Sequence, residues 1–470
     1  MVNLLPTVNV LLFAAFAVAQ QVVFDLEPDN TKFQVAIIGA GAAGSSAAYF
    51  LSKLDLDRSI NISVFERHDY VGGRTTTIDV RGETIELGAG IFVPENLILS
   101  EAAKEFNLTV IEADGDNDQA ESFDTIPYAT FDGEDVVFQF NSFSTWRQAL
   151  QLIWNFGISP TRAWAQRGAL VNNFLKLYEE PNFPWSDLTK VIGDLGLNES
   201  VQATAHKYFT DRRISESYQS QIIGAITRAF MAIDETKIHA LGAAVALTGS
   251  ANAKHIQGGN YQIFQKMIEA SGANLHLNSA IENIEHDQDK THWLVDGEPY
   301  DFVILASPYN FSKISIPEEI SIPKVDYVDL TVTLIASTKV MNGKYFGDHE
   351  SRYTNIIDIS PDHRFEAIHH IGVTKQGDQI YKIFSREVLS SQESATLLGL
   401  DPRDFVFFKV SKWYAYPEMV PREAFVDPEI EQGLFYTGGM DPFISTMETN
   451  ALSGKNAAYL VWDNIRKRLQ

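Results

Sequence analysis

The sequence of 470 residues contains no cysteine. This absence excludes disulfide bonds, thiolate metal sites and a flavin attached through a cysteine sulfur. Basic residues are scarce, because 37 Lys and Arg stand against 61 Asp and Glu and leave a net charge of −24. Such acidity argues against a nucleic-acid partner. The 11 histidines show no metal-ligand spacing, so we expect no metal site.

Long apolar runs are also missing. A membrane-spanning helix needs about 20 consecutive apolar residues, and the N-terminal run from Val10 to Val18 is far shorter. The run leads into Ala-Val-Ala before Gln20, which is typical of signal peptidase cleavage. The sequence therefore predicts a signal peptide over residues 1–19 and no transmembrane segment. An N-terminal membrane anchor is the alternative.

Three Asn-x-Ser/Thr sequons, at Asn107, Asn198 and Asn310, are expected to carry N-glycans. Sequons are glycosylated only in proteins that enter the secretory pathway, which agrees with the predicted signal peptide. We therefore expect the mature protein in the lysosome or vacuole, or outside the cell.

A dinucleotide-binding pattern follows the N-terminus. Gly39, Gly41 and Gly44 stand in G-x-G-x-x-G spacing between the apolar run FQVAII and a predicted helix over residues 45–54. Gly39 would allow a tight turn, Gly41 would let the backbone approach a pyrophosphate, and Gly44 would let the helix pack against the strand. The loop residues Ala42 and Ala43 belong to the same predicted site.

A second apolar run, ISVF, leads into Glu66 and Arg67. An acidic residue at the end of this strand would accept hydrogen bonds from the ribose hydroxyls of an adenosine. It would also repel a 2′-phosphate, which argues against NADP. Both Glu66 and Arg67 are therefore predicted to bind the cofactor.

Two further segments favour FAD over NAD. The segment VGGR, with Gly72, Gly73 and Arg74, resembles the second glycine pair of two-domain flavoproteins related to the amine oxidases. The segment ELGAGIF, with Gly88 and Ala89, resembles the strand end that approaches the flavin in the same proteins. The resemblance implies that all five residues contact FAD.

The C-terminal region fits the same cofactor. An apolar strand, LFYT, leads to Gly438 and Gly439, and a helix is predicted to start near Thr446. A helix N-terminus aimed at the pyrimidine edge of a flavin would stabilise negative charge there. Ser445 or Thr446 could cap that helix. The predicted cofactor site therefore also includes Gly438, Gly439, Thr446, Met447 and Glu448.

Longer segments resemble the prenylcysteine oxidase (prenylcysteine lyase) family. They are HIQGGNYQIFQKMIEASGA, FISTMETNALSGKNAA, VGGRTTTIDVRGETIELGAGIFVPENLIL and LIWNFGISPTR. The resemblance runs from about Val35 to about Val461. It implies an FAD-dependent thioether oxidase that uses O2. Such enzymes cleave S-farnesyl- or S-geranylgeranyl-cysteine to a prenyl aldehyde, cysteine and hydrogen peroxide.

Two segments depart from the family pattern. Residues 227–233 keep Arg228 but lack the Asn-Tyr-Gly that commonly follows it, and residues 438–442 read Gly-Gly-Met-Asp-Pro instead of Asn-Ala-Phe-Glu-Pro. These departures concern the substrate more than the flavin. The alternatives are a flavin oxidase of an amine or another apolar molecule, and a secreted flavoprotein without catalytic activity.

The pattern predicts an α/β fold with a discontinuous FAD-binding Rossmann-type domain and a substrate domain of sheet and helices. The amine-oxidase-like division assigns residues 33–107, 255–307 and 431–466 to the FAD-binding domain. Residues 108–254 and 309–430 would form the substrate domain. The segments LTVTLIAS and FVFFKVSKWYAY alternate apolar and polar residues and predict a sheet.

Apolar residues in the first insertion recur at helical spacing. Trp146, Leu150, Ile153 and Trp154 form one such series, and Leu170, Phe174 and Leu177 form another. This spacing favours helices packed on their own core. The alternative is an apolar channel for a long isoprenoid, or a face that touches a membrane.

No histidine or lysine stands out as a catalytic base. Hydride removal from a carbon beside sulfur depends on position more than on a base. The one candidate for substrate binding is Arg228, which could hold a carboxylate because arginine pairs bidentately with one. An arginine in a salt bridge or on the surface explains the residue equally well.

Overall fold

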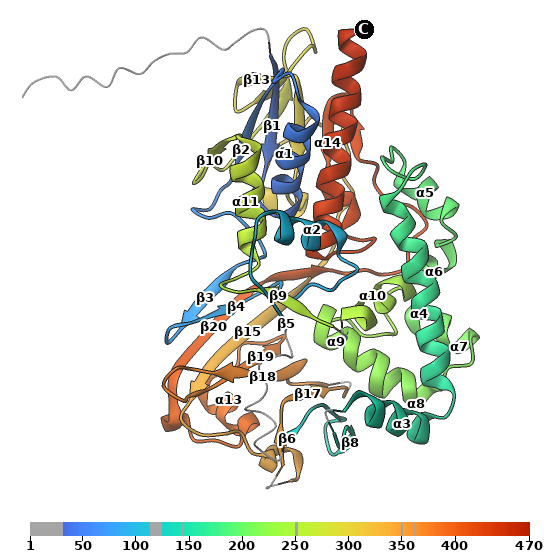
Figure 1. The fold of residues 1–470 in the computed structure, drawn as a ribbon, viewed down its shortest axis with the longest axis vertical. Coiled ribbons are helices and arrows are strands. Elements are labelled where there is room, and N and C mark those ends of the chain that lie inside the picture. Colours follow the sequence, from blue (N-terminus) through green and yellow to red (C-terminus); the bar gives the residue numbers. More distant parts are fainter. Residues whose placement is uncertain (1–31, 113–124, 143, 250–251, 349–350, 361) are drawn as a thin grey trace, which may run out of the picture.

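The computed structural model describes residues 32–112, 125–142, 144–249, 252–348, 351–360 and 362–470. The predicted signal peptide lies outside the described residues. Figure 1 shows a sheet flanked by helices in the upper part, long curved strands at the lower left and a group of helices on the right. The N-terminal and C-terminal segments of the chain meet in the upper part.

The upper sheet has six strands in the order β10–β2–β1–β14–β22–β21. All neighbours in it are parallel except β21 and β22. It joins three stretches of chain that lie far apart in the sequence. Its strands are β1 (Phe33–Ile38), β2 (Ile60–Phe65), β10 (Asn274–His276), β14 (Phe302–Leu305), β21 (Glu429–Glu431) and β22 (Leu434–Tyr436).

Strand β1 is buried on both faces, as the centre of a parallel sheet should be. Val35 and Ile37 face one core, which the helices α1, α11 and α14 cover. Ala36 and Ile38 face another core, which a small antiparallel sheet covers. The covering elements are α1 (Ala42–Leu54), α11 (Tyr261–Ser271), α14 (Met447–Leu469), β11 (Ile284–His286), β12 (Trp293–Val295) and β13 (Glu298–Tyr300).

The segment NLHLNSAIENIEH divides into two strands, β10 and β11, because residues 277–283 leave the upper sheet. Asn278 takes a left-handed backbone conformation with φ 53°. The amides of Asn278 and Ser279 donate to the carbonyls of His68 and Glu66. The segment after β2 therefore fixes this turn. The alternation of apolar and polar residues in the sequence does not predict such a contact.

The lower sheet has seven strands in the order β20–β15–β19–β18–β17–β7–β8. Its neighbours are antiparallel except β17 and β7. The long strands β15 and β20 pair along most of their length and rise toward the upper sheet (Figure 1). The strands are β7 (Ala129–Phe131), β8 (Val136–Gln139), β15 (Tyr327–Ser337), β17 (Asn355–Asp358), β18 (Ala367–Val373), β19 (Gln379–Ser385) and β20 (Phe405–Pro417).

Two-stranded sheets and short helices connect the main parts. Strand pairs are β3 (Thr77–Val80) with β4 (Glu83–Glu86), β5 (Val110–Glu112) with β9 (Lys254–Ile256), and β6 (Thr125–Ile126) with β16 (Arg352–Tyr353). The connecting helices are α2 (Leu97–Glu105), α12 (Tyr309–Ser312) and α13 (Ser391–Leu398).

A group of helices lies along the right side of the molecule in Figure 1, beside α14 and the lower sheet. They are α3 (Thr145–Phe156), α4 (Ser159–Leu175), α5 (Leu188–Asp194), α6 (Asn198–Gln202), α7 (Ala205–Asp211), α8 (Glu216–Tyr218), α9 (Ala225–Met231) and α10 (Ala240–Gly249). Leu170, Phe174 and Leu177 are buried in this part, as predicted.

The prediction that α3 packs its apolar residues in a core is wrong. Trp146 is 62% exposed, Leu150 58%, Ile153 50% and Trp154 89%. Of the helix, Phe156 is the residue that is buried. The predicted helix is present, but the face that carries the apolar residues points into solvent.

The axes of α1 and α14 come together where backbone meets backbone. A Cβ at Gly454 would lie 1.9 Å from the carbonyl oxygen of Ala43, and a Cβ at Gly44 would lie 1.8 Å from the carbonyl oxygen of Gly39. Distances this short exclude any side chain. Gly454 therefore lets α14 lie directly on α1, and Gly44 lets the first turn of α1 lie directly on the loop after β1.

We expect Gly454→Ala to destabilise the protein by about 3 kcal/mol or more, because the new methyl group has to push α14 off α1. Gly168→Ala is the matched control, since Gly168 lies in α4 with nothing within 4 Å of its Cβ position. It should raise stability by about 0.5–1 kcal/mol through helix propensity. Chemical denaturation of both variants measures the difference, and equal stability would contradict the packing argument.

Candidate functional site

The first glycine loop joins β1 to α1 at the carboxyl edge of the upper sheet. Gly39 has φ +111°, and a Cβ there would lie 2.7 Å from the carbonyl oxygen of Ala306. Gly41 is the N-cap of α1 and leaves the helix N-terminus without a side-chain cap. Such a terminus offers backbone N–H groups and partial positive charge to an anion. Gly39, Gly41, Ala42 and Ala43 line the large cavity of the protein.

The second glycine pair lies directly against the first loop. The amide of Gly72 donates to the carbonyl oxygen of Ala40 at 2.9 Å, and a Cβ at Gly73 would lie 3.3 Å from the Cα of Gly41. Both glycines have positive φ, 125° and 59°. Backbone from two segments thus forms one wall of the cavity with no side chain in the way.

Glu66 lies at the end of β2 and is buried. Its carboxylate accepts hydrogen bonds from the amides of Ala40 and His68, each at 2.9 Å. A carboxylate has about four acceptor positions, so it can still accept ribose hydroxyls. The side chain of Arg67 donates to the carbonyl oxygen of Phe311 at 3.1 Å. Both residues line the cavity.

The cavity has a volume of about 760 Å³. It extends from the two glycine loops past the end of β14 to the N-terminus of α14. Ligand cavities of proteins span about 300–1,000 Å³, so this one can hold a large cofactor. Glycines in both loops also let the main chain itself line the cavity, which is the arrangement that a pyrophosphate needs.

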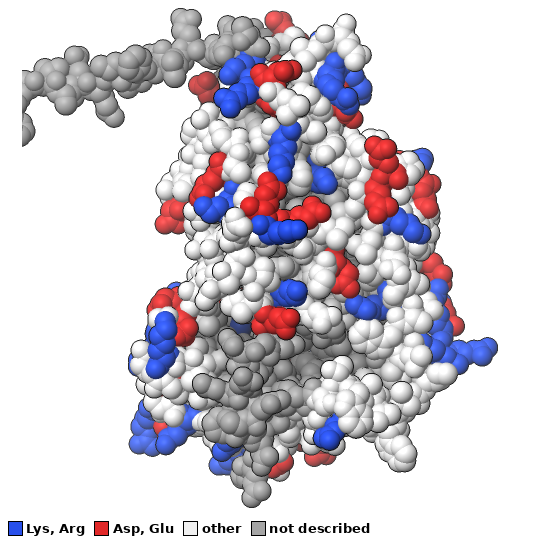
Figure 2. Space-filling model, in the orientation of Figure 1, with Lys and Arg blue, Asp and Glu red and all other residues white. Residues whose placement is uncertain are grey.

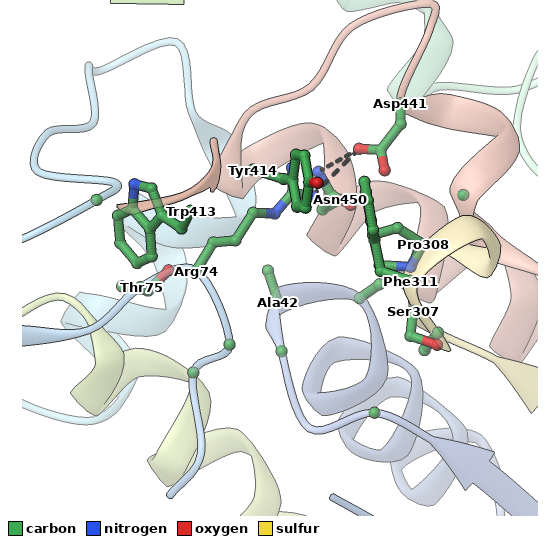
Figure 3. A pocket seen from close by; sticks show the side chains of 18 of the residues that line it. Ala42, Arg74, Thr75, Ser307, Pro308, Phe311, Trp413, Tyr414, Asp441 and Asn450 are labelled. Carbon is green, nitrogen blue, oxygen red and sulfur yellow. Dashed lines mark hydrogen bonds and ion pairs between the residues drawn. The ribbon is translucent and has the colours of Figure 1, made fainter. Parts of the chain in front are cut away.

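Arg74 reaches into the cavity and pairs with Asp441 (Figure 3). Its Nη2 lies 3.3 Å from Oδ1 of Asp441. Burial disfavours the charge of the guanidinium, but the pKa of Arg74 is raised because Asp441 and other partners outweigh the burial. Arg74 thus stays a cation next to the cofactor position.

Asp441 accepts hydrogen bonds from donors in three parts of the chain, one of which holds Arg74. Its Oδ1 accepts from Ser445 Oγ at 2.6 Å and Asn450 Nδ2 at 3.3 Å, and its Oδ2 accepts from the Tyr327 hydroxyl at 2.5 Å. Burial, followed by the negative charge of Asp441, raises the pKa of Tyr327 far above its usual range. Tyr327 is therefore a neutral donor, and Asp441 is a positioning carboxylate with its acceptor sites in use.

The C-terminal segment completes the cavity. Thr446 is the N-cap of α14 and accepts from the amide of Thr449 at 3.1 Å. Gly438, Thr446 and Met447 line the cavity. Gly439 does not line it, and a Cβ there would lie 2.5 Å from the carbonyl oxygen of Val426. Gly439 is thus required for packing under the cofactor position.

Gly88 and Ala89 line the cavity from the segment after β4. A Cβ at Gly88 would lie 2.3 Å from the carbonyl oxygen of Arg74 and 2.6 Å from the indole of Trp413. Gly44 lies behind the first loop and does not line the cavity. Its role is the close packing of α1 described above.

Glu448 and Arg228, which were predicted to lie in the site, bind other parts of the protein. Glu448 points away from the large cavity and accepts from the amides of Ile98 and Leu99 at 2.9 and 3.0 Å, so it caps α2. It lines a smaller cavity instead, together with Tyr178, whose hydroxyl donates to it at 2.9 Å. Burial raises the pKa of the Glu448 carboxyl to about 7. The expectation that it contacts the cofactor is corrected accordingly.

Arg228 is committed inside the protein. Its Nη2 pairs with Asp234 Oδ2 at 2.5 Å, and its Nη1 donates to the carbonyl oxygens of Asp358 and Ser360 at 3.3 and 3.1 Å. It lines neither cavity. The proposed role in holding a substrate carboxylate is therefore replaced by the salt-bridge alternative, in which Arg228 joins α9 to the loop after β17.

Sequence reasoning missed the aromatic wall of the cavity. Trp413, Tyr414 and Tyr416 come from β20, and Phe311 and Tyr327 come from α12 and β15. Figure 3 shows Trp413 on the side of the cavity opposite Pro308 and Ser307. The ring of Tyr414 stacks on that of Phe311, with centroids 4.3 Å apart. The aromatic richness of β20 was the available signal, but it predicts a strand and does not say which side chains face a ligand.

The residues that the structure describes contain no group of three or more histidine, aspartate or glutamate side chains arranged to hold a metal ion.

These features define the class of the protein: an α/β protein with a Rossmann-type site that binds FAD. The overall fold is similar to that of cyclohexylamine oxidase from Brevibacterium oxydans IH-35A, with TM-score 0.61 and 15% identity over 93% of this chain and 100% of that one. It is also similar to putrescine oxidase bound to putrescine, with TM-score 0.59 and 16% identity over 92% of this chain and 99% of that one. The predicted fold class is confirmed.

The chain belongs to the prenylcysteine lyase family, whose family model matches residues 139–470. A model of NAD(P)-binding Rossmann-like domains matches residues 37–112. Farnesylcysteine lyase of Arabidopsis thaliana is 30% identical over 92% of this chain and 89% of the relative. Prenylcysteine oxidase 1 of Homo sapiens is 26% identical over 91% of this chain and 88% of the relative. The resemblance read from the sequence is thereby confirmed.

A half-buried carboxyl, that of Glu86, directly precedes the cavity-lining residues Leu87 and Gly88 in the chain. Glu86 Oε1 accepts from the amide of Asn260 at 2.6 Å, while its Oε2 has no hydrogen-bond partner among the described residues. The Lys382 ammonium donates to the carbonyl oxygen of Glu86 at 2.7 Å. Burial raises the pKa of Glu86 to about 7 and lowers the pKa of Lys382 to about 8.

The raised pKa of Glu86 predicts a pH-dependent stability difference between the wild type and Glu86→Gln. The folded state holds the Glu86 proton more tightly than the unfolded state, so this residue costs stability as the pH rises from about 4.5 through 7. Glu86→Gln should match the wild type at pH 5 and be more stable at pH 8, by at most about 3 kcal/mol. Thermal unfolding at the two pH values measures this difference. The exposed Glu134→Gln should show no such change, and a constant difference for Glu86→Gln would contradict the assignment.

Proposed function

We propose that this protein is an FAD-dependent oxidase that cleaves the thioether bond of S-farnesyl-cysteine or S-geranylgeranyl-cysteine. One observation carries the proposal: relatives named farnesylcysteine lyase and prenylcysteine oxidase align over about nine-tenths of the chain. The cofactor cavity supports it, because both glycine loops and Glu66 remain in place. The reaction consumes prenylcysteine, water and dioxygen and yields a prenyl aldehyde, cysteine and hydrogen peroxide.

FAD, when bound, supplies the oxidation of the carbon beside sulfur, with dioxygen as the final acceptor. The residues of the chain supply position and exclude water. Trp413 and Tyr414 cover the cavity with aromatic surface, and Asp441 fixes the hydroxyl of Tyr327 and the guanidinium of Arg74. None of these groups is placed as a free base. The cavity therefore suits a reaction that depends on orientation of the substrate.

The decisive experiment mixes purified holoenzyme with S-farnesyl-cysteine in the absence of oxygen. We expect the visible absorption of oxidised FAD to bleach, and farnesal and peroxide to form when air is admitted. S-Dodecyl-cysteine is the control, because it has a long apolar chain but no allylic double bond, and it should react far more slowly. A protein that keeps its colour with prenylcysteines but bleaches with cyclohexylamine or putrescine would replace this proposal with an amine oxidase.

The cellular location is a further part of the proposal. We infer entry into the secretory pathway through the signal peptide, delivery to the lysosome or vacuole or to the outside, and N-glycans at Asn107, Asn198 and Asn310. All three asparagines are exposed in the structure, so oligosaccharides have room there. A mass decrease of the purified protein after enzymatic removal of N-glycans is the measurement that tests this route.

We also propose that the protein touches membranes through α3. The side chains of Trp146, Leu150, Ile153 and Trp154 share one face of this helix and are at least half exposed. Figure 2 shows that the surface at the lower right, over α3, carries few charges. Tryptophan at the edge of an apolar face is typical of helices that lie in the membrane interface. No described helix is apolar and long enough to span a bilayer.

Vesicle flotation tests this contact. We expect the wild type to float with phosphatidylcholine vesicles, which carry no net charge to repel an acidic protein. The double variant Leu150→Ser, Trp154→Ser should bind the vesicles roughly tenfold more weakly or worse, because two apolar side chains no longer enter the interface. Leu56→Ser is the matched control, since Leu56 is 88% exposed but lies away from α3. Equal flotation of all three proteins would exclude α3 as the membrane contact.

A further inference from the structure

A second cavity of about 150 Å³ opens beside the cofactor cavity. The two share Ala89, Tyr416, Ser445, Thr446 and Met447 as a common wall. Beyond this wall the smaller cavity lies among α4, α9, α10 and the segment after β4. One layer of residues therefore separates the two cavities, and the smaller cavity lies next to the cofactor cavity on the far side of that layer.

Apolar side chains dominate the smaller cavity. Phe174 and Val171 come from α4, Phe230 comes from α9, and Val245 comes from α10. All of these lie outside the cofactor cavity. Residues four apart on α10, Val245 and Gly249, share the face that looks into it.

The polar side chains that line only the smaller cavity already have partners. Glu448 accepts from two amides and from Tyr178, and Thr248 donates to the carbonyl oxygen of Ala244 at 2.9 Å. Glu95 pairs with Arg167 at 3.8 Å. The same holds for Asn96, which accepts from the amide of Val93, and for Thr449, which donates to the carbonyl oxygen of Ile444. An apolar ligand in this cavity is stabilised by contacts with apolar side chains. A polar ligand would pay the free-energy cost of desolvation without forming new hydrogen bonds.

The volume sets the size of the ligand portion. An apolar cavity of about 150 Å³ is known to hold benzene, a ring of six carbons. An isoprene unit has five carbons, so the smaller cavity as it stands holds about one unit. A farnesyl chain has three units, and the others have to lie in the cofactor cavity, along the common wall or at the outer end.

We propose that the smaller cavity binds the isoprenoid chain of the substrate, and that Val245 limits how far the chain enters. This inference rests on the proposed function for the identity of the reacting group. The common wall places the thioether end of the chain beside the cofactor, and the chain passes Met447 toward α10. Hydrocarbon length, not charge, is then what this cavity recognises.

Val245→Phe and Val245→Ala test the proposal in opposite directions. The probes are geraniol, farnesol and geranylgeraniol, which carry the chain without the thioether and are not cleaved. Their binding to oxidised holoenzyme is measured by the change in FAD absorption and by calorimetry. Burial of each CH2 is worth roughly fourfold in affinity, so Val245→Phe, which fills the cavity, should weaken farnesol binding by about tenfold or more. The matched control is Val388→Phe on the surface, where Val388 is 59% exposed.

Val245→Ala enlarges the cavity and should bind geranylgeraniol better relative to farnesol than the wild type does. It carries no risk of overpacking, so it remains informative if Val245→Phe does not fold. Unchanged dissociation constants for the three alcohols in Val245→Ala would overturn the proposal, as would a Val245→Phe protein that binds them like Val388→Phe.

The same proteins are then mixed with S-prenyl-cysteines of matching chain length. If the alcohols respond to Val245 but no prenylcysteine bleaches the flavin, the cavity assignment stands and the proposed reaction fails. If prenylcysteines bleach the flavin in every variant with the same dependence on chain length, the reaction stands and the cavity assignment fails.

Discussion

Direct contact between backbone segments holds the cofactor cavity in shape. The amide of Gly72 donates to the carbonyl of Ala40, and the second glycine pair thereby lies on the first loop. On the other side of α1, Gly454 brings α14 against the carbonyl of Ala43. The contact at Gly454 is closer than any side chain allows. Because β1, the VGGR loop and α14 are locked together in this way, the walls of the cavity are set largely by the main chain.

The buried carboxylate of Asp441 organises the polar groups at the end of the cavity near α14. Asp441 is 1% exposed and binds Arg74, Tyr327, Ser445 and Asn450, which come from three distant parts of the chain. A buried carboxylate is tolerated only when its oxygens have such partners. The result is a rigid polar edge next to an aromatic wall. This combination holds a reacting group in place without offering a free acid or base.

In the helices of the first insertion, some apolar faces are buried and others are exposed. Leu170 and Phe174 of α4 are buried, and the cavity beside the cofactor opens among α4, α9 and α10. In α3, the same helical spacing puts Trp146 and Trp154 on the outside. A period of apolar residues therefore shows that a helix has an apolar face, but it does not say what covers that face. For this reason the prediction that the apolar face packs in a core is wrong for α3 and correct for α4.

The glycine spacing, Glu66 and the apolar runs beside them were enough to predict a Rossmann-type dinucleotide site, because they are local and act through the backbone. The resemblance of VGGR and ELGAGIF to flavoprotein segments favoured FAD. The longer segments were enough to recognise the family. The sequence by itself also determined the acidic surface and the absence of thiol chemistry. Tertiary structure alone decided that Asp441 meets Arg74, that Glu448 caps α2 instead of facing the cofactor, and that Arg228 donates to the carbonyl oxygens of Asp358 and Ser360. These groups are far apart in sequence, and only the packing of the elements brings them together.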